Sequence, residues 1–144
     1  MEYKLSKSSE KDINRLIEYK NRTIYQYAKD LSNEEIDRIN KYVTSEVPRL
    51  INDYCNIIVD NKIIGCILLT NNDNGKLLDE IYLEEEYRNK GYSKILNDAI
   101  LNEAKKKRYN RIYLKSNLVN YYEKFGAKYI KTLNNKEKLY YIDL

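Results

Sequence analysis

The sequence predicts a single α+β domain, in which a mixed β-sheet of six or seven strands packs with about four helices. Three observations predict it. Two helical patterns follow a short first strand, apolar strands separated by turn residues fill residues 54–83, and helices alternate with strands from there onward. The expected order is βααβββαβαββ. Because the chain has one proline, no repeats and no linker-like stretch, residues 1–144 are expected to form one domain.

Capping residues and apolar periodicity place the two N-terminal helices. A strand is expected over residues 2–5, and Ser9 is the expected N-cap of the helix that follows. Ser32 and Glu35 match a capping box, which would start the second helix. The apolar faces consist of Ile13, Leu16, Ile17, Ile24 and Tyr27 in the first helix, and of Ile36, Ile39 and Val43 in the second.

The middle of the chain favours β-strands. They are expected over residues 55–59, 63–70 and 76–83. The turn dipeptides Asp60-Asn61 and Asn74-Gly75 separate them, and the second is typical of a type I′ hairpin. The second of these runs is apolar enough for a central strand of the sheet.

The C-terminal part is expected to alternate between helix and strand. A helix begins after Gly91, and its apolar stripe is Ile95, Leu96, Ala99, Ile100 and Ala104. A strand over residues 111–116 and a short helix over about 119–125 follow. Two final strands are expected on either side of Asn134-Asn135.

The composition excludes several kinds of chemistry. The chain has no histidine and only two cysteines, Cys55 and Cys66, so we expect no metal site and no Ser-His-Asp or Cys-His catalysis. Proton transfer must fall to carboxylates, tyrosines, lysines, cysteines or water. Both cysteines lie in expected strands and are expected to be buried. Without a signal peptide or a membrane-spanning run, the protein is expected to be cytoplasmic, with no membrane partner.

Charge is divided unevenly along the chain. Residues 1–87 contain 12 Lys+Arg and 17 Asp+Glu, whereas residues 88–144 contain 14 and 5, so the two parts carry −5 and +9. A basic half attracts either nucleic acid or a phosphorylated cofactor, and charge alone does not choose between them. Because the sequence carries no aromatic-plus-basic RNA-binding signature, nucleic acid is not the expected partner.

The most informative stretch is residues 81–96, where a strand passes through a loop directly into a helix. The loop holds Arg88, Lys90 and Gly91. The first turn of a helix has unpaired N–H groups and a positive dipole end, and glycine lets the backbone come close to a phosphate. The arrangement therefore indicates an anion site. The alternative at this point is a glycine that only permits a tight turn.

Two stretches carry a resemblance to a known family. Arg88-Asn89-Lys90-Gly91-Tyr92-Ser93 resembles the pyrophosphate loop of the GNAT superfamily of N-acetyltransferases, Gln/Arg-x-x-Gly-x-Gly/Ala, with serine in the last position. Glu85 stands where the family commonly has proline. Downstream, Asn120-Tyr121-Tyr122-Glu123-Lys124-Phe125-Gly126-Ala127 is similar to the fourth-helix signature Tyr-x-Lys-x-Gly-Phe, with alanine in place of the last aromatic residue.

The resemblance implies a mostly antiparallel sheet whose fourth and fifth strands splay apart, so that the pantetheine arm of acetyl-CoA lies between them. Main-chain N–H groups near the end of the fourth strand would bind this arm and polarise the thioester carbonyl. Amides of the loop would hold the pyrophosphate. The implied cofactor contacts are Ile81, Tyr82, Leu83, Arg88, Asn89, Lys90, Gly91, Tyr92, Ser93 and Asn117.

The resemblance also implies catalytic roles. Tyr122 matches the family tyrosine that donates a proton or hydrogen bond to the departing thiolate; the alternative is a tyrosine packed on the core. Many relatives have a glutamate base early in the fourth strand, where this chain has Leu77. Asp79 is then the candidate base, and strand alternation puts Glu80 on the opposite face. A base acting through water, or an amine that arrives neutral, is equally possible.

The expected reaction is transfer of an acetyl group from acetyl-CoA to a primary amine of a small molecule, by direct attack. Residues 29–54 contain 4 Lys+Arg and 6 Asp+Glu, which would favour a cationic amine. The alternatives are acetylation of a protein N-terminus or lysine, and a non-catalytic acyl-CoA-binding or regulatory domain. The protein is expected to be a monomer or a homodimer.

Overall fold

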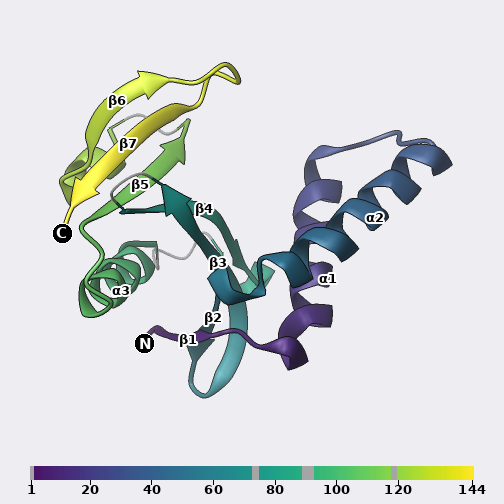
Figure 1. Ribbon diagram of the computed structural model, residues 1–144, viewed down its shortest axis with the longest axis horizontal. Coiled ribbons are helices and arrows are strands. Elements are labelled where there is room, and N and C mark those ends of the chain that lie inside the picture. Colours follow the sequence, from purple (N-terminus) through teal and green to yellow (C-terminus); the bar gives the residue numbers. More distant parts are fainter. Residues whose placement is uncertain (1, 73–74, 89–92, 118–119) are drawn as a thin grey trace.

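A seven-stranded β-sheet runs through the molecule in the order β1-β2-β3-β4-β5-β7-β6 (Figure 1). The computed structural model describes residues 2–72, 75–88, 93–117 and 120–144. The strands are β1 (Lys4–Lys7), β2 (Tyr54–Val59), β3 (Lys62–Asn72), β4 (Gly75–Leu83), β5 (Arg111–Ser116), β6 (Lys128–Thr132) and β7 (Lys138–Asp143). All neighbours pair antiparallel except β4 and β5, which are parallel. The prediction of a mixed, mostly antiparallel sheet is confirmed.

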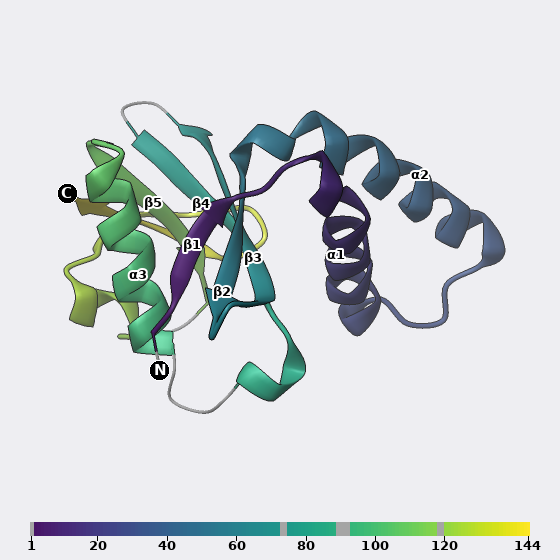
Figure 2. The same ribbon diagram turned by 90° about the horizontal axis from the view of Figure 1, so that it is seen from below.

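Helices cover the two faces of the sheet unequally. The described chain contains three α-helices and four short 3₁₀ turns. They are α1 (Ile13–Tyr27), α2 (Asn33–Arg49), α3 (Ser93–Lys106), η1 (Glu10–Asp12), η2 (Ile51–Asp53), η3 (Glu85–Tyr87) and η4 (Tyr122–Phe125). Figure 2 shows α3 on one side of the sheet and the α1–α2 pair on the other. None of the described helices is both long and apolar enough to cross a membrane.

The structure moves the first strand from the predicted residues 2–5 to β1, and it shortens the fourth predicted helix. The sequence indicated a helix over about residues 119–125, but in the described part of this segment only the 3₁₀ turn η4 forms. Asn120 before it has φ 56° and Gly126 after it has φ 87°, both in the left-handed region. A right-handed helix cannot continue through such residues, so the segment between them is limited to about one turn.

The second helix begins where the sequence predicted, whereas the first begins one 3₁₀ turn after its predicted N-cap. The amide of Glu35 donates to Ser32 Oγ at 3.2 Å, and the amide of Ser32 donates to Glu35 Oε1 at 3.3 Å, which completes the capping box of α2. Ser9 is the N-cap of η1, which leads directly into α1. Its amide donates to the buried carboxylate of Asp12 at 2.9 Å.

The turn and strand predictions are confirmed at several points. Asp60 and Asn61 have φ of 49° and 63°, as a type I′ turn between β2 and β3 requires. The strand predicted over residues 111–116 has the bounds of β5. Asn74, in the predicted hairpin dipeptide, lies outside the described residues, and Gly75 begins β4.

Two apolar clusters lie against the sheet. The larger includes residues of α3, β2, β3, β4, β5 and β7, and the smaller joins α1 and α2 to β2, β3 and β4. The larger cluster consists of Tyr3, Cys55, Ile57, Val59, Ile64, Ile67, Leu69, Leu78, Leu96, Ile100, Ala104, Ile112, Leu114, Ala127, Tyr140 and Ile142. The smaller consists of Leu16, Tyr19, Val43, Val47, Tyr54, Cys66, Leu68 and Tyr82. β4 contributes to both, so it lies between the two cores.

Candidate active site

The parallel strands β4 and β5 separate after a short ladder. Their pairing runs over three residue pairs and ends at Leu78 and Leu114. Beyond this point β4 continues to Leu83, paired with β3 but with no strand of the described chain on its other side. A cleft of about 190 Å³ opens there, lined by Leu78, Asp79, Glu80, Ile81, Leu114, Lys115 and Tyr122. The expected splay of the fourth and fifth strands is therefore confirmed.

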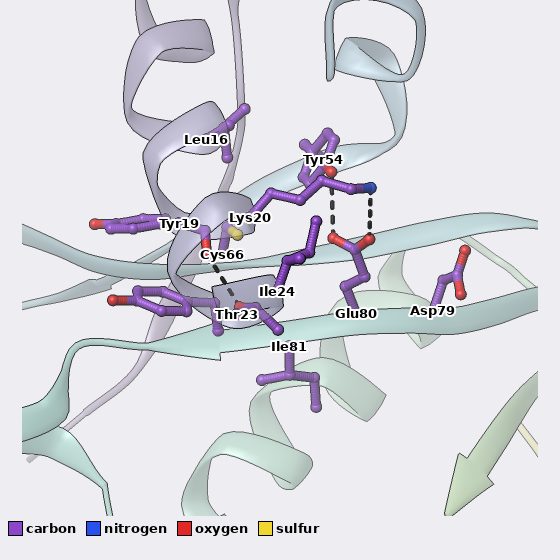
Figure 3. Close-up of a pocket in the computed structure, with 11 residues that line it drawn as sticks. Leu16, Tyr19, Lys20, Thr23, Ile24, Tyr54, Cys66, Asp79, Glu80 and Ile81 are labelled. Atoms are coloured by element: carbon purple, nitrogen blue, oxygen red, sulfur yellow. Dashed lines mark hydrogen bonds and ion pairs between the residues drawn. The ribbon is translucent and has the colours of Figure 1, made fainter. Parts of the chain in front are cut away.

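A β-bulge in β4 decides which way its carboxylates point. Leu69 of β3 pairs with Leu78 and Leu68 pairs with Glu80, so Asp79 is an extra residue without a partner in β3. The prediction that Asp79 and Glu80 lie on opposite faces is wrong, because the bulge interrupts the alternation on which it rested. Figure 3 shows both side chains on the same side of the strand.

A second cavity, of about 260 Å³, lies on the α1–α2 side of β4 (Figure 3). It is named the acceptor pocket after the role proposed for it. Its lining comes from α1, β2, β3 and β4 and consists of Leu16, Tyr19, Lys20, Thr23, Ile24, Tyr54, Cys66, Asp79, Glu80, Ile81 and Tyr82. Asp79, Glu80 and Ile81 line both the acceptor pocket and the cleft. The two cavities therefore adjoin at the bulge.

Glu80 is held in the acceptor pocket by two donors. Lys20 Nζ lies 2.8 Å from one carboxylate oxygen, and the hydroxyl of Tyr54 donates to the other at 3.3 Å (Figure 3). Burial raises the pKa of Tyr54 above its usual value, and the negative charge of Glu80 raises it further, so this phenol remains a hydrogen-bond donor. Both oxygens of the Glu80 carboxylate therefore have a hydrogen-bond donor.

Asp79 has a different partner. Lys115 Nζ of β5 lies 3.1 Å from its carboxylate, so this ion pair spans the cleft from one strand to the other. About a third of each side chain is exposed, so solvent screens the pair. Asp79 thus connects the two splayed strands, whereas Glu80 faces the interior of the acceptor pocket.

The end of β4 carries a layer of aromatic and cationic side chains. Tyr82 stacks on Tyr19 with ring centroids 4.2 Å apart, and the Arg88 guanidinium lies 5.0 Å from the centre of the Tyr82 ring. Arg88 Nε donates to the carbonyl oxygen of Leu83 at 2.6 Å. This bond fastens the first residue of the predicted anion loop to the last residue of β4.

Most of the predicted anion loop lies outside the described residues. Asn89, Lys90, Gly91 and Tyr92 lie outside the described residues, and Ser93 begins α3 without its side chain being described. The other predicted cofactor contacts are described. Ile81 lines both cavities, Tyr82 lines the acceptor pocket, and Asn117 is an exposed residue directly after β5.

Tyr122 also lines the cleft. It belongs to η4 and is partly buried, and its ring makes an edge contact with Tyr121 at 4.8 Å. Burial raises the pKa of Tyr122, so its phenol is protonated at neutral pH. Tyr121 instead accepts a hydrogen bond from Asn97 of α3 at 3.2 Å, which fixes η4 to that helix.

The matching family model is that of the acetyltransferase (GNAT) family, and it covers residues 17–127. This range is more than half of the chain and contains both sequence motifs and every lining residue of the two cavities except Leu16. The chain belongs to the GNAT family of acetyltransferases. No curated protein matches it by sequence.

Solved structures of acetyltransferases share the fold. PaiA N-acetyltransferase from Thermoplasma acidophilum, in complex with coenzyme A, is 23% identical, with a TM-score of 0.71 over the whole of both chains. N-acetylglutamate synthase from Neisseria gonorrhoeae, complexed with coenzyme A and N-acetyl-glutamate, is 13% identical with a TM-score of 0.70, over all of this chain and 35% of that one. A GNAT acetyltransferase from Bacillus anthracis is 19% identical with a TM-score of 0.64, over 99% and 95% of the two chains.

Sequence reasoning missed the contribution of α1 to the GNAT site. Lys20 and Thr23 line the acceptor pocket together with Leu16 and Ile24, which the sequence analysis assigned only to an apolar face. A signal was present, because Lys20 lies four residues from both Leu16 and Ile24 and so interrupts the apolar stripe with a cation. The pairing of Lys20 with a carboxylate of β4 had no local signal.

The two cysteines are buried, as predicted. Cys66 lines the acceptor pocket, and burial raises the pKa of its thiol to about 12. Burial likewise raises the pKa of Cys55, in the larger core. Neither thiol is a nucleophile at neutral pH. Among the described residues, no cluster of three or more His, Cys, Asp or Glu could hold a metal ion.

Proposed function

We propose that this GNAT protein transfers the acetyl group of acetyl-CoA to the primary amine of a small molecule. The observation that supports this most is the junction of two cavities at the bulge of β4. The cleft between β4 and β5 has Tyr122 on its wall, and the acceptor pocket has Glu80 in its interior. A thioester at this junction would have both a proton donor and a carboxylate among the residues that line the two cavities.

The cleft has features that suit the pantetheine arm of acetyl-CoA. Beyond Leu78 the main chain of β4 has pairing groups turned toward a gap that a peptide-like arm can fill. Arg88 and the loop that follows it, together with the first turn of α3, would hold the pyrophosphate. Bound there, acetyl-CoA supplies an activated acyl group.

The reaction needs two proton transfers. The acceptor nitrogen forms a bond to the thioester carbonyl carbon, and the bond from this carbon to sulfur breaks. The departing thiolate takes a proton from Tyr122, which solvent then restores. Glu80 takes the proton that the acceptor nitrogen loses, through a water molecule. Main-chain N–H groups near Ile81 stabilise the negative charge on the carbonyl oxygen.

The size of the acceptor pocket favours a small molecule. Its volume of about 260 Å³ lies just below the usual range for ligand pockets, about 300–1,000 Å³. Residues 29–54 contribute only Tyr54 to its described lining, although their acidity had suggested a cationic amine. That acidity lies mainly on α2, away from the pocket lining, and we do not base the acceptor class on it.

The experiment is release of free CoA thiol from acetyl-CoA across a panel of amines, with mass spectrometry of the products. The panel includes small amines, amino acids, a peptide with a free N-terminus and a peptide with an internal lysine. Turnover on a small amine is the expected result. Coenzyme binding without turnover on any amine would instead indicate a regulatory domain, and turnover on the peptides alone would indicate a protein acetyltransferase. Gly91→Val serves as the coenzyme-binding control, because added bulk would crowd the phosphates.

A further inference from the structure

The acceptor pocket contains a built-in cation. The side chain of Lys20 is only 10% exposed and reaches from α1 across the pocket to Glu80 of β4 (Figure 3). Groups near its ammonium include the hydroxyl of Tyr54, which shares Glu80 with it, and the ring of Tyr42, whose centre lies 5.5 Å away. The carboxylate of Glu46 on α2 also interacts with Lys20, but it is itself paired with Arg49 at 2.7 Å. A lysine so enclosed is positioned by the fold, and it presents a fixed positive charge to any acceptor that enters.

The charges around the pocket are already balanced. Lys20 pairs with Glu80, and Lys115 pairs with Asp79 at the junction with the cleft. Entry of a second unpaired cation into this largely apolar pocket would therefore be unfavourable. An acceptor with one positive and one negative group would keep the balance, with its ammonium on Glu80 and its anionic group on Lys20.

The spacing of the pair limits how far apart the two groups of the acceptor can be. Lys20 Nζ and Glu80 Oε1 are 2.8 Å apart, so the atoms that replace or join this contact must also be close neighbours. An amine and a carboxylate on the same carbon atom meet this condition, whereas the ends of a long amino acid or a diamine do not. The geometry points to the α-amino group of an amino acid as the acceptor, with Lys20 binding its carboxylate.

The remaining lining selects the side chain of that amino acid. Leu16, Ile24 and Ile81 supply apolar surface, and Tyr19 supplies an aromatic ring stacked on Tyr82. These groups match an aliphatic or aromatic side chain better than a charged one. This inference rests on the proposed function, since it names the acceptor class of the same site.

The test compares acceptors that differ only at the carboxylate. L-Leucine is compared with L-leucinamide and 3-methylbutan-1-amine, and L-phenylalanine with L-phenylalaninamide and 2-phenylethylamine, each with acetyl-CoA. For the wild-type protein we expect kcat/KM to be about 10- to 100-fold higher for an amino acid than for its carboxylate-free partners, the usual effect of a charge-assisted hydrogen bond. Lys20→Met should remove this preference, and Lys20→Arg should retain most of it.

The ratio between acceptors separates recognition from a merely structural role. Loss of Lys20 also changes the surroundings of Glu80, which would alter the rate with every acceptor alike. Dividing the wild-type preference by the variant preference cancels that change, and it also cancels the differing basicity of the amines. Lys62→Met is the matched control, because it removes an exposed lysine that pairs with Glu86 and does not line the pocket.

Three results would overturn the inference. They are equal kcat/KM for amino acid, amide and amine, an unchanged preference in Lys20→Met, and no acetylation of either amino acid. Calorimetric titration with CoA and the wider amine panel show whether the proposed function fails as well. If CoA binds and another amine is acetylated, only the amino-acid inference is wrong.

Discussion

The face of the sheet under α3 is packed by sixteen buried apolar side chains of the described chain, whereas the face under α1 and α2 buries eight and opens into the acceptor pocket. Aliphatic residues dominate the first cluster, and three of the eight in the second are tyrosines. The first face is a packed core. The second face has fewer buried apolar side chains and a cavity lined in part by polar groups. Substitutions on the first face should therefore mainly lower stability, and substitutions on the second should mainly lower activity.

The largest expected effect is on folding, on the α3 face. Ile57 of β2 is fully buried in the larger cluster, and Ile57→Ala should lower the free energy of unfolding by about 2–5 kcal/mol. Urea denaturation measures this. The matched control is Ile24→Ala, which truncates a partly buried residue lining the acceptor pocket. It should cost clearly less stability and should raise KM for the acceptor. Equal destabilisation by both would mean that the two faces do not differ in this way.

The next effect concerns catalysis on the pocket face. Glu80→Gln keeps the shape of the side chain and removes the proton acceptor, so kcat should fall about 100-fold, or about 2.7 kcal/mol. Asp79→Asn should have a smaller effect, because Asp79 pairs with Lys115 across the cleft. Steady-state kinetics of the two variants tests the base directly. A larger loss in Asp79→Asn would restore the residue that the sequence alone nominated.

The smallest of the three effects is at Tyr122. Removing its hydroxyl in Tyr122→Phe should lower kcat about tenfold, or about 1.4 kcal/mol, while calorimetry shows CoA affinity unchanged. Burial raises the pKa of Tyr122, so the wild-type rate should hold through pH 10, the usual value for a phenol, and fall only as pH rises through the raised pKa. The variant should lack this alkaline fall. An unchanged kcat would remove Tyr122 from the chemistry.

The sequence predicted the strands well because their signals are local. Turn dipeptides such as Asp60-Asn61 and the alternating run over residues 111–116 depend only on near neighbours. The second GNAT motif contributes Tyr122 to the wall of the cleft. The helix predicted over about residues 119–125 is too long, because the identity of Asn120 does not predict its left-handed conformation.

The parts of the site that the sequence could not provide come from contacts between distant segments. The bulge at Asp79 depends on the register of β4 against β3. The residues of β4 alone do not predict it. The Lys20–Glu80 pair joins residues 60 positions apart. Such pairings depend on how α1 packs on the sheet. Periodicity predicts which face of α1 is buried, but it does not predict which residues that face contacts.

The central claim is that the gap between β4 and β5 holds the coenzyme, and hydrogen–deuterium exchange with and without saturating CoA tests it most directly. We expect the backbone amides of residues 79–83 to become protected when CoA binds, because the pantetheine arm would pair with groups that no strand of the described chain covers. The amides of β1 and β2 should exchange as before. Unchanged exchange over residues 79–83 under conditions where calorimetry shows CoA bound would contradict the account.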